Sequence, residues 1–105
     1  MSTTEAKFSV GQIIHHRMFD YRGVVIDVDP EFQGPEEWYD KMARSRPPKE
    51  KPWYHVLVDG SNIQTYVAEQ NLDPDQSGAS IRHPDILLHF TELTPQGYTT
   101  RRADN

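Results

Sequence analysis

The segment Arg22–Asp29 constrains the fold more than any other part of the sequence, because its residues alternate as those of a β-strand do. Val24, Ile26 and Val28 fall on one face, and Val25, Asp27 and Asp29 fall on the other. β-Branched side chains favour the extended backbone, and Pro30 ends the strand because it has no N–H to donate. Gly23, near the start of the strand, predicts a bulge or a tight bend at that point.

Other stretches of the chain also predict strands. Residues 53–58 and 63–68 have the composition of a β-hairpin, and Asp59–Asn62 between them is a run of turn-forming residues. Residues 10–16 are expected to form a turn that leads into a strand, and a last strand is expected at 98–102. Short strands, tight turns and one long excursion favour a mostly β fold in the form of a small, strongly bent barrel.

One or two short helices are expected beside the strands. The segment Pro35–Arg44 begins with a proline, which suits the first helical position, and its acidic first turn and basic last turn match the helix dipole. Trp38 and Met42 lie four residues apart, so they would share one face of this helix. The segment Pro84–Phe90 is typical of one or two helical turns, and residues 73–80 are expected to be a polar linker.

The length of 105 residues is that of one ordinary domain. We expect a disordered N-terminus over residues 1–6, one domain over 7–102 with a variable loop at 31–52, and a tail at 103–105. Cysteine is absent, which excludes disulfides, thiol catalysis and thiolate metal sites. No segment approaches the roughly 20 apolar residues that cross a bilayer, and the first residues lack the order of a signal peptide. A cytoplasmic protein without a membrane partner is therefore expected.

The chemistry-bearing residues favour a binding protein over an enzyme. Asp27 and Asp29 share a strand face, which would allow acid–base chemistry, but acidic residues are also common at a strand end. His15 and His16 would point to opposite faces of a strand, and His55 stands alone in its strand. We therefore expect structural or surface histidines in preference to a metal site. The sequence contains no nucleophile elbow, phosphate loop or metallohydrolase motif. We expect no catalytic residues, no metal and no cofactor.

One cluster is a candidate for partner binding. It combines the cations Lys41, Arg44, Arg46, Lys49 and Lys51 with the aromatic residues Trp38, Tyr39, Trp53 and Tyr54. Cations between aromatic rings can hold a nucleic-acid strand or an acidic protein segment, here with residues 46–52 as an extended, mobile arm. The alternative is a solvated loop whose aromatic side chains pack into the core. The formal net charge of −5 disfavours generic DNA binding, which depends on cations that neutralise phosphates.

Four segments, taken together and in order, resemble a known family. They are Phe8-x-Val10-Gly11-Gln12-x-x-x-His16, Tyr21-x-Gly23-Val24-Val25-x-Asp27-x-Asp29-Pro30, Pro52-Trp53-Tyr54-His55-Val56 and Thr65-Tyr66-Val67-Ala68-Glu69-x-x-Leu72. This combination is similar to the HspQ family of small bacterial heat-shock proteins, also called the YccV-like or hemimethylated-DNA-binding domain family. The likeness covers Lys7 to about Leu72, with the long loop as a variable insert.

The resemblance implies a small SH3-like β-barrel, no catalytic residues and the ability to form trimers. It also implies one of two roles. The first is that of a stress factor that acts on the Lon protease and promotes the degradation of denatured proteins, among them a replication initiator. The second is the binding of hemimethylated DNA. The first role is the leading hypothesis, with the cation–aromatic cluster as the contact with protease or client, and DNA binding is the alternative because of the net charge.

The C-terminal part differs from the short bacterial members, which continue past Leu72 into acidic and Ser/Pro-rich sequence. Here Ile81-x-His83-Pro84-x-Ile86-x-x-x-Phe90, followed by Gly97-Tyr98, resembles the longer form fused to eukaryotic F-box proteins. The resemblance to the short form therefore leaves the role of residues 81–102 open, together with any role that depends on the short form's tail, such as protease contact.

Overall fold

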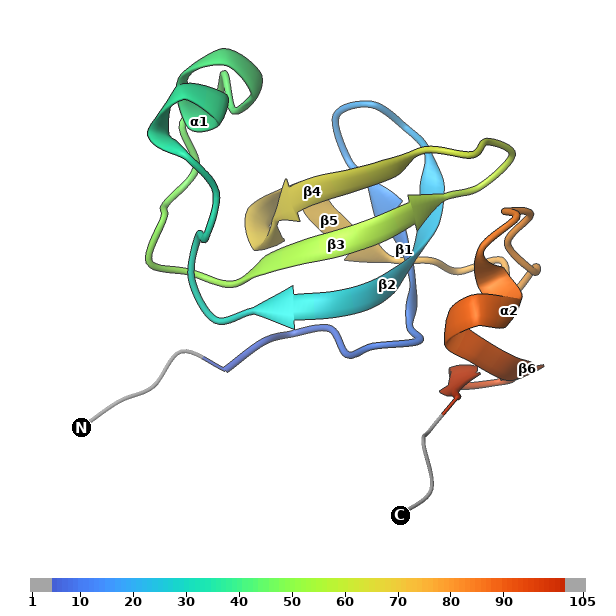
Figure 1. Ribbon diagram of the computed structural model, residues 1–105. Helices are drawn as coiled ribbons and strands as arrows, with labels where there is room; N and C mark the ends of the chain where they lie inside the picture. The colour runs from blue at the N-terminus through green and yellow to red at the C-terminus, as the bar shows by residue number, and fades with distance from the viewer. Residues whose placement is uncertain (1–4, 102–105) are drawn as a thin grey trace.

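The chain folds mainly into β-strands in the computed structural model, which describes residues 5–101 (Figure 1). Five antiparallel strands form one sheet in the order β4-β3-β2-β1-β5, and two more form a separate hairpin. The strands of the sheet are β1 (Ile13–His16), β2 (Arg22–Asp29), β3 (Trp53–Val58), β4 (Gln64–Ala68) and β5 (Leu72–Pro74). The predicted mostly β fold is confirmed, while the expectations for residues 1–4 and 103–105 lie outside the described residues.

The predicted short helices are also present. They are α1 (Glu36–Met42) and α2 (Ile86–His89), and a 3-10 helix (Glu69–Asn71) joins β4 to β5. Pro35 takes the capping position just before α1, where its backbone is extended, and is not the first helical residue. Among residues 5–101, no helix has the length and apolar character needed to cross a membrane.

Closure of the sheet into an SH3-like barrel is not confirmed, because no ladder joins the edge strands β4 and β5 within the described part of the chain. The strand β5 itself was not expected. Its residues lie partly in the predicted polar linker, yet Leu72 pairs with His16 and Pro74 with Ile14. Leu72 is buried, whereas Asp73 and Pro74 are exposed. A strand of three residues is too short for an alternating pattern of apolar and polar side chains to be recognised in the sequence.

A bulge in β2 changes the faces that its side chains occupy. Val25 lies opposite Val56 and Asp27 lies opposite His55, so Ile26 is the extra residue. Val24 and Ile26 pack on one side of the sheet, but Val28 packs with Val25 on the other, and the predicted common face of Val24, Ile26 and Val28 is wrong. The bulge is also not at Gly23. That glycine instead allows close approach of β3, since a Cβ there would lie 2.7 Å from the Leu57 carbonyl oxygen.

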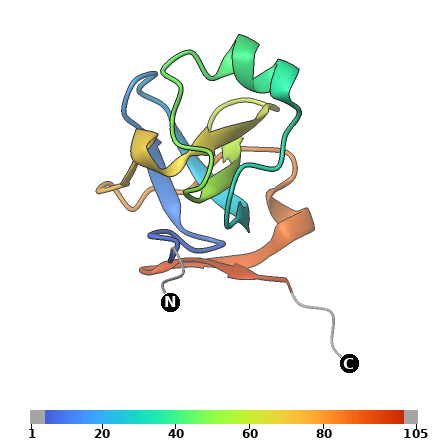
Figure 2. The ribbon, with the colours of Figure 1, turned by 90° about the vertical axis from the view of Figure 1, so that its left-hand side faces the viewer.

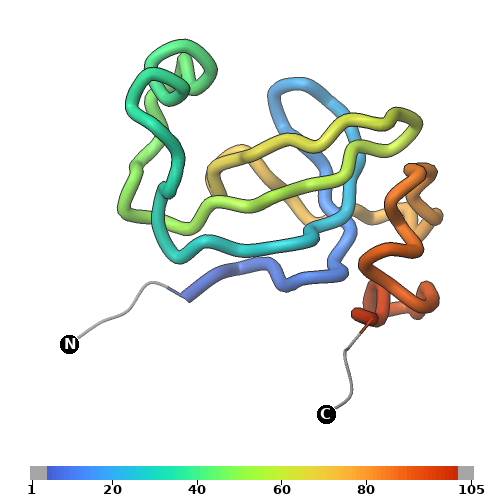
Figure 3. The backbone as a smooth tube through the Cα atoms, viewed as in Figure 1, coloured from blue at the N-terminus to red at the C-terminus, as the bar shows by residue number. Residues whose placement is uncertain are grey.

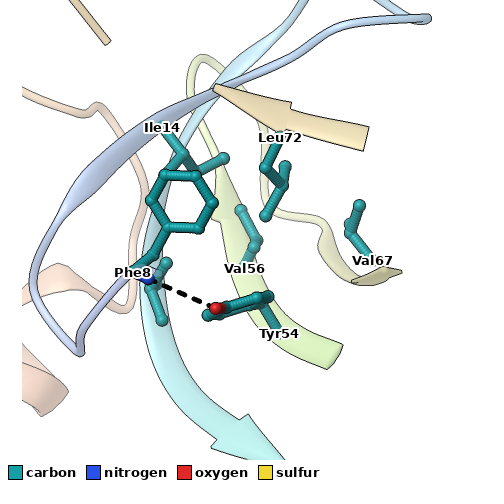
Figure 4. Close-up of a cluster of buried hydrophobic side chains, with 7 residues drawn as sticks. Phe8, Ile14, Tyr54, Val56, Val67 and Leu72 are labelled. Carbon is teal, nitrogen blue, oxygen red and sulfur yellow. Dashed lines mark hydrogen bonds between the residues drawn. The ribbon is translucent and has the colours of Figure 1, made fainter. Parts of the chain in front are cut away.

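The inner face of the sheet carries one apolar cluster (Figure 4). It consists of Phe8, Ile14, Val25, Tyr54, Val56, Val67 and Leu72. The Tyr54 hydroxyl accepts a hydrogen bond from the backbone N–H of Phe8 at 3.2 Å and donates one to Glu69 Oε2 at 2.6 Å. Burial and the neighbouring Glu69 raise the pKa of Tyr54, so it stays a neutral donor. The N-terminal segment is thereby attached to the sheet before β1 begins.

The outer face is covered by the C-terminal part of the chain. Residues consecutive to those of the inner cluster point to this face, where Ile13, Val24 and Leu57 pack against Ile81 and Phe90. Phe90 begins β6 (Phe90–Thr94), which forms a hairpin with β7 (Gly97–Thr100). The strand β6 was not predicted, and the last strand begins one residue earlier than expected.

Figure 2 shows this hairpin, in orange-red, running beneath the N-terminal segment. The two are joined by a hydrogen bond from the Tyr98 N–H to the Gly11 carbonyl oxygen at 2.7 Å. Gly11 has φ of 95°, and a Cβ there would lie 2.2 Å from the Tyr98 carbonyl oxygen. Only glycine therefore fits at this contact.

We predict that Phe90→Ala lowers the free energy of unfolding by about 3–5 kcal/mol, because it leaves a cavity against the outer face of the sheet. Leu93→Ala is the matched control on the same strand, where the side chain is 37% exposed and the cost should stay below about 1 kcal/mol. Urea denaturation of both variants measures the difference. Equal effects would show that the C-terminal hairpin is not part of the core.

Candidate functional site

Three of the four aromatic residues of the predicted partner-binding cluster pack against the sheet. Trp53 and Tyr39 are buried and Trp38 is partly buried, in a cluster completed by Phe32, Ala43, Tyr66 and Ala68. Figure 3 traces the loop 31–52 as an excursion, mostly green, that leaves the end of β2 and returns to the start of β3. The ring of Trp53 lies 4.8 Å from that of Phe32. These rings attach the loop to the sheet and leave little aromatic surface for a partner.

The fourth aromatic residue, Tyr54, does not join this cluster. Successive residues of a strand point to opposite faces, so Trp53 faces the loop while Tyr54 faces the inner core. Both rings are therefore buried, each in its own cluster. The structure supports the solvated-loop alternative for the aromatic half of the predicted cluster.

The loop is also held by hydrogen bonds to its prolines. The Tyr39 hydroxyl donates to the Pro47 carbonyl oxygen at 2.6 Å, and the Trp53 indole N–H donates to that of Pro48 at 3.1 Å. Pro47 and Pro52 are buried. Residues 46–52 are thus attached at several points and do not form the extended arm that was expected.

The cations of the loop divide into two groups. Lys49 forms an ion pair with Glu36 and lies 4.4 Å from the centre of the Tyr39 ring, and Arg46 pairs with Asp40 at 3.2 Å. Lys41, Arg44 and Lys51 are exposed, and within residues 5–101 they have no ion-pair partner. Residues 31–52 contain five carboxylates and five cations, so the loop as a whole is not basic. The role of these cations in binding stays a prediction.

A second group of side chains gathers at the end of β2. Asp27, Asp29 and His55 have ligand atoms within 4.8 Å of one another, so His55 does not stand alone as the sequence suggested. Oxygen and nitrogen donors of this kind suit transition metals. However, one carboxylate oxygen of Asp29 already accepts a hydrogen bond from the Tyr66 hydroxyl at 2.6 Å and lies 3.2 Å from His55 Nε2. Burial and the bond to Asp29 raise the pKa of Tyr66, which keeps its proton. The group acts as a hydrogen-bonded link between β2, β3 and β4.

The turn between β1 and β2 holds a feature that sequence reasoning missed. It exposes two large apolar side chains, Met18 at 58% and Phe19 at 72%. A shallow hollow beside them is lined by Arg17, Met18, Gln70 and Asn71. The signal in the sequence was two apolar residues in succession directly before the turn residue Asp20, whose φ of 59° is left-handed.

One family of proteins matches almost the whole domain. Its model, described as "Hemimethylated DNA-binding protein YccV like", covers residues 6–97. The chain belongs to the YccV-like family. The match extends beyond Leu72 through α2 and β6, so the C-terminal layer is part of the region that the family model describes. The description names a bound macromolecule and no reaction.

In this YccV-like chain, we predict that Tyr39→Phe destabilises the domain by about 1–3 kcal/mol, because the buried Pro47 carbonyl loses its donor. Arg44→Gln is the control on the same loop, since an exposed side chain without a partner should change stability by no more than about 0.5 kcal/mol. Thermal unfolding followed by tryptophan fluorescence measures both. A neutral Tyr39→Phe would contradict the attachment of the loop described above.

Proposed function

We propose that this YccV-like domain is a non-enzymatic cytoplasmic adaptor that brings denatured protein segments to a Lon-type protease. The observation that supports the proposal is the exposure of Met18 and Phe19 at the turn between β1 and β2. The protease and the stress role come from the resemblance to HspQ-type proteins. The exposed Met18 and Phe19 form an apolar surface, which is suited to binding the exposed apolar side chains of a denatured client.

An unfolded segment differs from a folded surface in its accessible apolar side chains, so its receptor must offer apolar surface in return. Phe19 is the most exposed of the large apolar residues in the described chain, and Met18 beside it has a flexible, polarizable side chain that adapts to different partners. β4 is an edge strand, which offers backbone groups to an extended peptide. Neither feature demands a particular client sequence.

The charges of the molecule support a protein partner over a nucleic acid. The net charge is −5, and two of the five loop cations are paired with carboxylates. Affinity for DNA depends on the number of phosphates that free cations can neutralise. A denatured client has no such requirement.

We predict that Phe19→Ser raises the concentration of the domain that half-maximally stimulates degradation by about tenfold, because truncating an apolar anchor costs more than about 1 kcal/mol of binding energy. The matched control is Met42→Ser, where the side chain is 64% exposed and belongs to α1. The measurement is the rate at which a purified Lon-type protease degrades a heat-denatured client over a concentration series. No stimulation by the parent domain, or the same loss in both variants, would refute the proposal.

Binding of hemimethylated DNA is a second candidate, because the description of the family names it. Within the loop 31–52, the exposed and unpaired cations Lys41, Arg44 and Lys51 are the candidate phosphate contacts. Three such contacts would give weak, strongly salt-dependent binding. Recognition of a single methyl group would in addition require contact with base edges in the major groove.

For this candidate we predict that affinity falls with salt, and that Lys51→Gln lowers the slope of log K against log[salt] by about 0.9. Arg82→Gln is the control, because it removes an exposed cation outside the loop that is already paired with Asp59 at 3.8 Å. Fluorescence anisotropy with a hemimethylated duplex and its unmethylated counterpart measures both slope and preference. Equal effects of the two substitutions would count against the loop as the contact.

A further inference from the structure

The apolar turn is fixed by a buried histidine. His16, the last residue of β1, is only 4% exposed. Its Nδ1 accepts two hydrogen bonds, from the backbone N–H groups of Met18 and Phe19, each at 3.1 Å. The ring of Phe19 is stacked on the imidazole with 4.7 Å between centres, and that of Tyr21 lies 5.0 Å away. One side chain thus sets both the backbone and the side-chain position of the turn.

This arrangement requires one protonation state of His16. An atom that accepts two N–H donors cannot carry a proton itself, so Nδ1 must be free and the proton must be on Nε2. Within residues 5–101, the hydrogen bonds of the ring are the two that Nδ1 accepts. Protonation of Nδ1 would place a third N–H against the other two and break both bonds.

We propose that His16 is a pH-sensitive latch, which holds Met18 and Phe19 in their exposed position when it is neutral and releases the turn when it is protonated. The latch would regulate the surface named in the proposed function, so its effect on clients rests on that function. The pH response of the turn does not depend on the proposed function.

The surroundings of the ring favour the neutral form. Across the ladder in β5 its partner is Leu72, which is apolar. The nearby titratable and charged groups are His15, paired with Asp20 at 2.5 Å; Arg17, paired with Asp73 at 3.6 Å; and Tyr21, hydrogen-bonded to Thr65. None of these carboxylates pairs with His16. Burial lowers the pKa of His16 below the ordinary histidine value, and the neighbouring His15 lowers it further.

The direction of the pH effect follows from this lowered pKa. Between the folded-state pKa and the ordinary value of about 6.5, the unfolded chain binds a proton that the folded chain does not. The stability contributed by His16 is therefore complete above this window and falls as the pH drops through it. The turn opens at the lower end of the same window, where folded His16 itself becomes protonated.

Two substitutions at His16 separate its role as a hydrogen-bond acceptor from its ability to take up a proton. His16→Asn keeps an oxygen close to the position of Nδ1, which can accept from the N–H two residues on as in an Asx-turn, but does not titrate. His16→Phe keeps a ring of similar size without an acceptor. His15→Asn is the control, because it removes the neighbouring ring and its pair with Asp20 but leaves the latch.

The experiment follows the amide signals of Met18 and Phe19 by NMR in the free chain of 105 residues from pH 8 to pH 4.5, together with the ring nitrogens of His16. We expect the Nε2–H tautomer at high pH and an about tenfold loss of the latched population on protonation, from the breaking of two hydrogen bonds. His16→Asn should stay latched at every pH and His16→Phe open at every pH. His15→Asn should keep the transition but move its midpoint to a slightly higher pH, because His15 lowers the pKa of His16.

Two results would overturn the latch. One is that the amide signals of Met18 and Phe19 stay constant while the ring nitrogens of His16 titrate. This result is obtained with the unsubstituted protein, so it does not depend on a variant that folds. The other is loss of the transition in His15→Asn, which would assign it to the His15–Asp20 pair. Client degradation compared between His16→Asn and His16→Phe then tests the link to function: a latch that titrates with equal degradation by both variants would refute the proposed client surface and leave the latch intact.

Discussion

The pairing of β2 with β3 is the constraint on which the rest of the structure depends. Both strands lie inside the sheet and carry apolar residues on both faces, and the bulge at Ile26 decides which side chain serves which face. Past the bulge, Val28 turns to the inner core and Asp29 lies opposite Trp53. The loop 31–52 therefore leaves and returns at neighbouring positions, where Phe32 meets Trp53. The loop, the inner core and the outer layer all follow from this one ladder.

Much of the fold could be predicted from the sequence because its longest strands are regular. Alternating β-branched residues in β2, and the hairpin around Asp59–Asn62, are local signals that tertiary packing did not override. The bulge at Ile26 could not be foreseen, since it depends on the register of β3, which is not a local property. β5 and β6 were missed for a similar reason, because short strands are defined by their partners more than by their own composition.

The candidate site was predicted less well than the fold. Residue types alone suggested that the cations and rings of the loop act together, but neighbouring residues of a strand face opposite ways, which separates Trp53 from Tyr54. Ion pairs then neutralise Arg46 and Lys49, and an ion pair between residues far apart in sequence leaves no local pattern. Conversely, the exposed Met18 and Phe19 donate their backbone N–H groups to His16, a contact that no local sequence pattern indicates. Membership of the YccV-like family, by contrast, was visible in four short segments taken in order.

The contact between Gly11 and Tyr98 has a consequence for how the molecule assembles. It joins positions near the two ends of the described chain, so its formation closes a loop that includes nearly the whole domain, and the entropy lost grows with the length of that loop. Once the five-stranded sheet has formed, the two ends of this loop are already close, so docking of the last hairpin costs little further conformational entropy. The last hairpin should therefore dock late, after the central strands have found their register. On a ribosome, the domain would complete its core only when almost all of its residues had been synthesised.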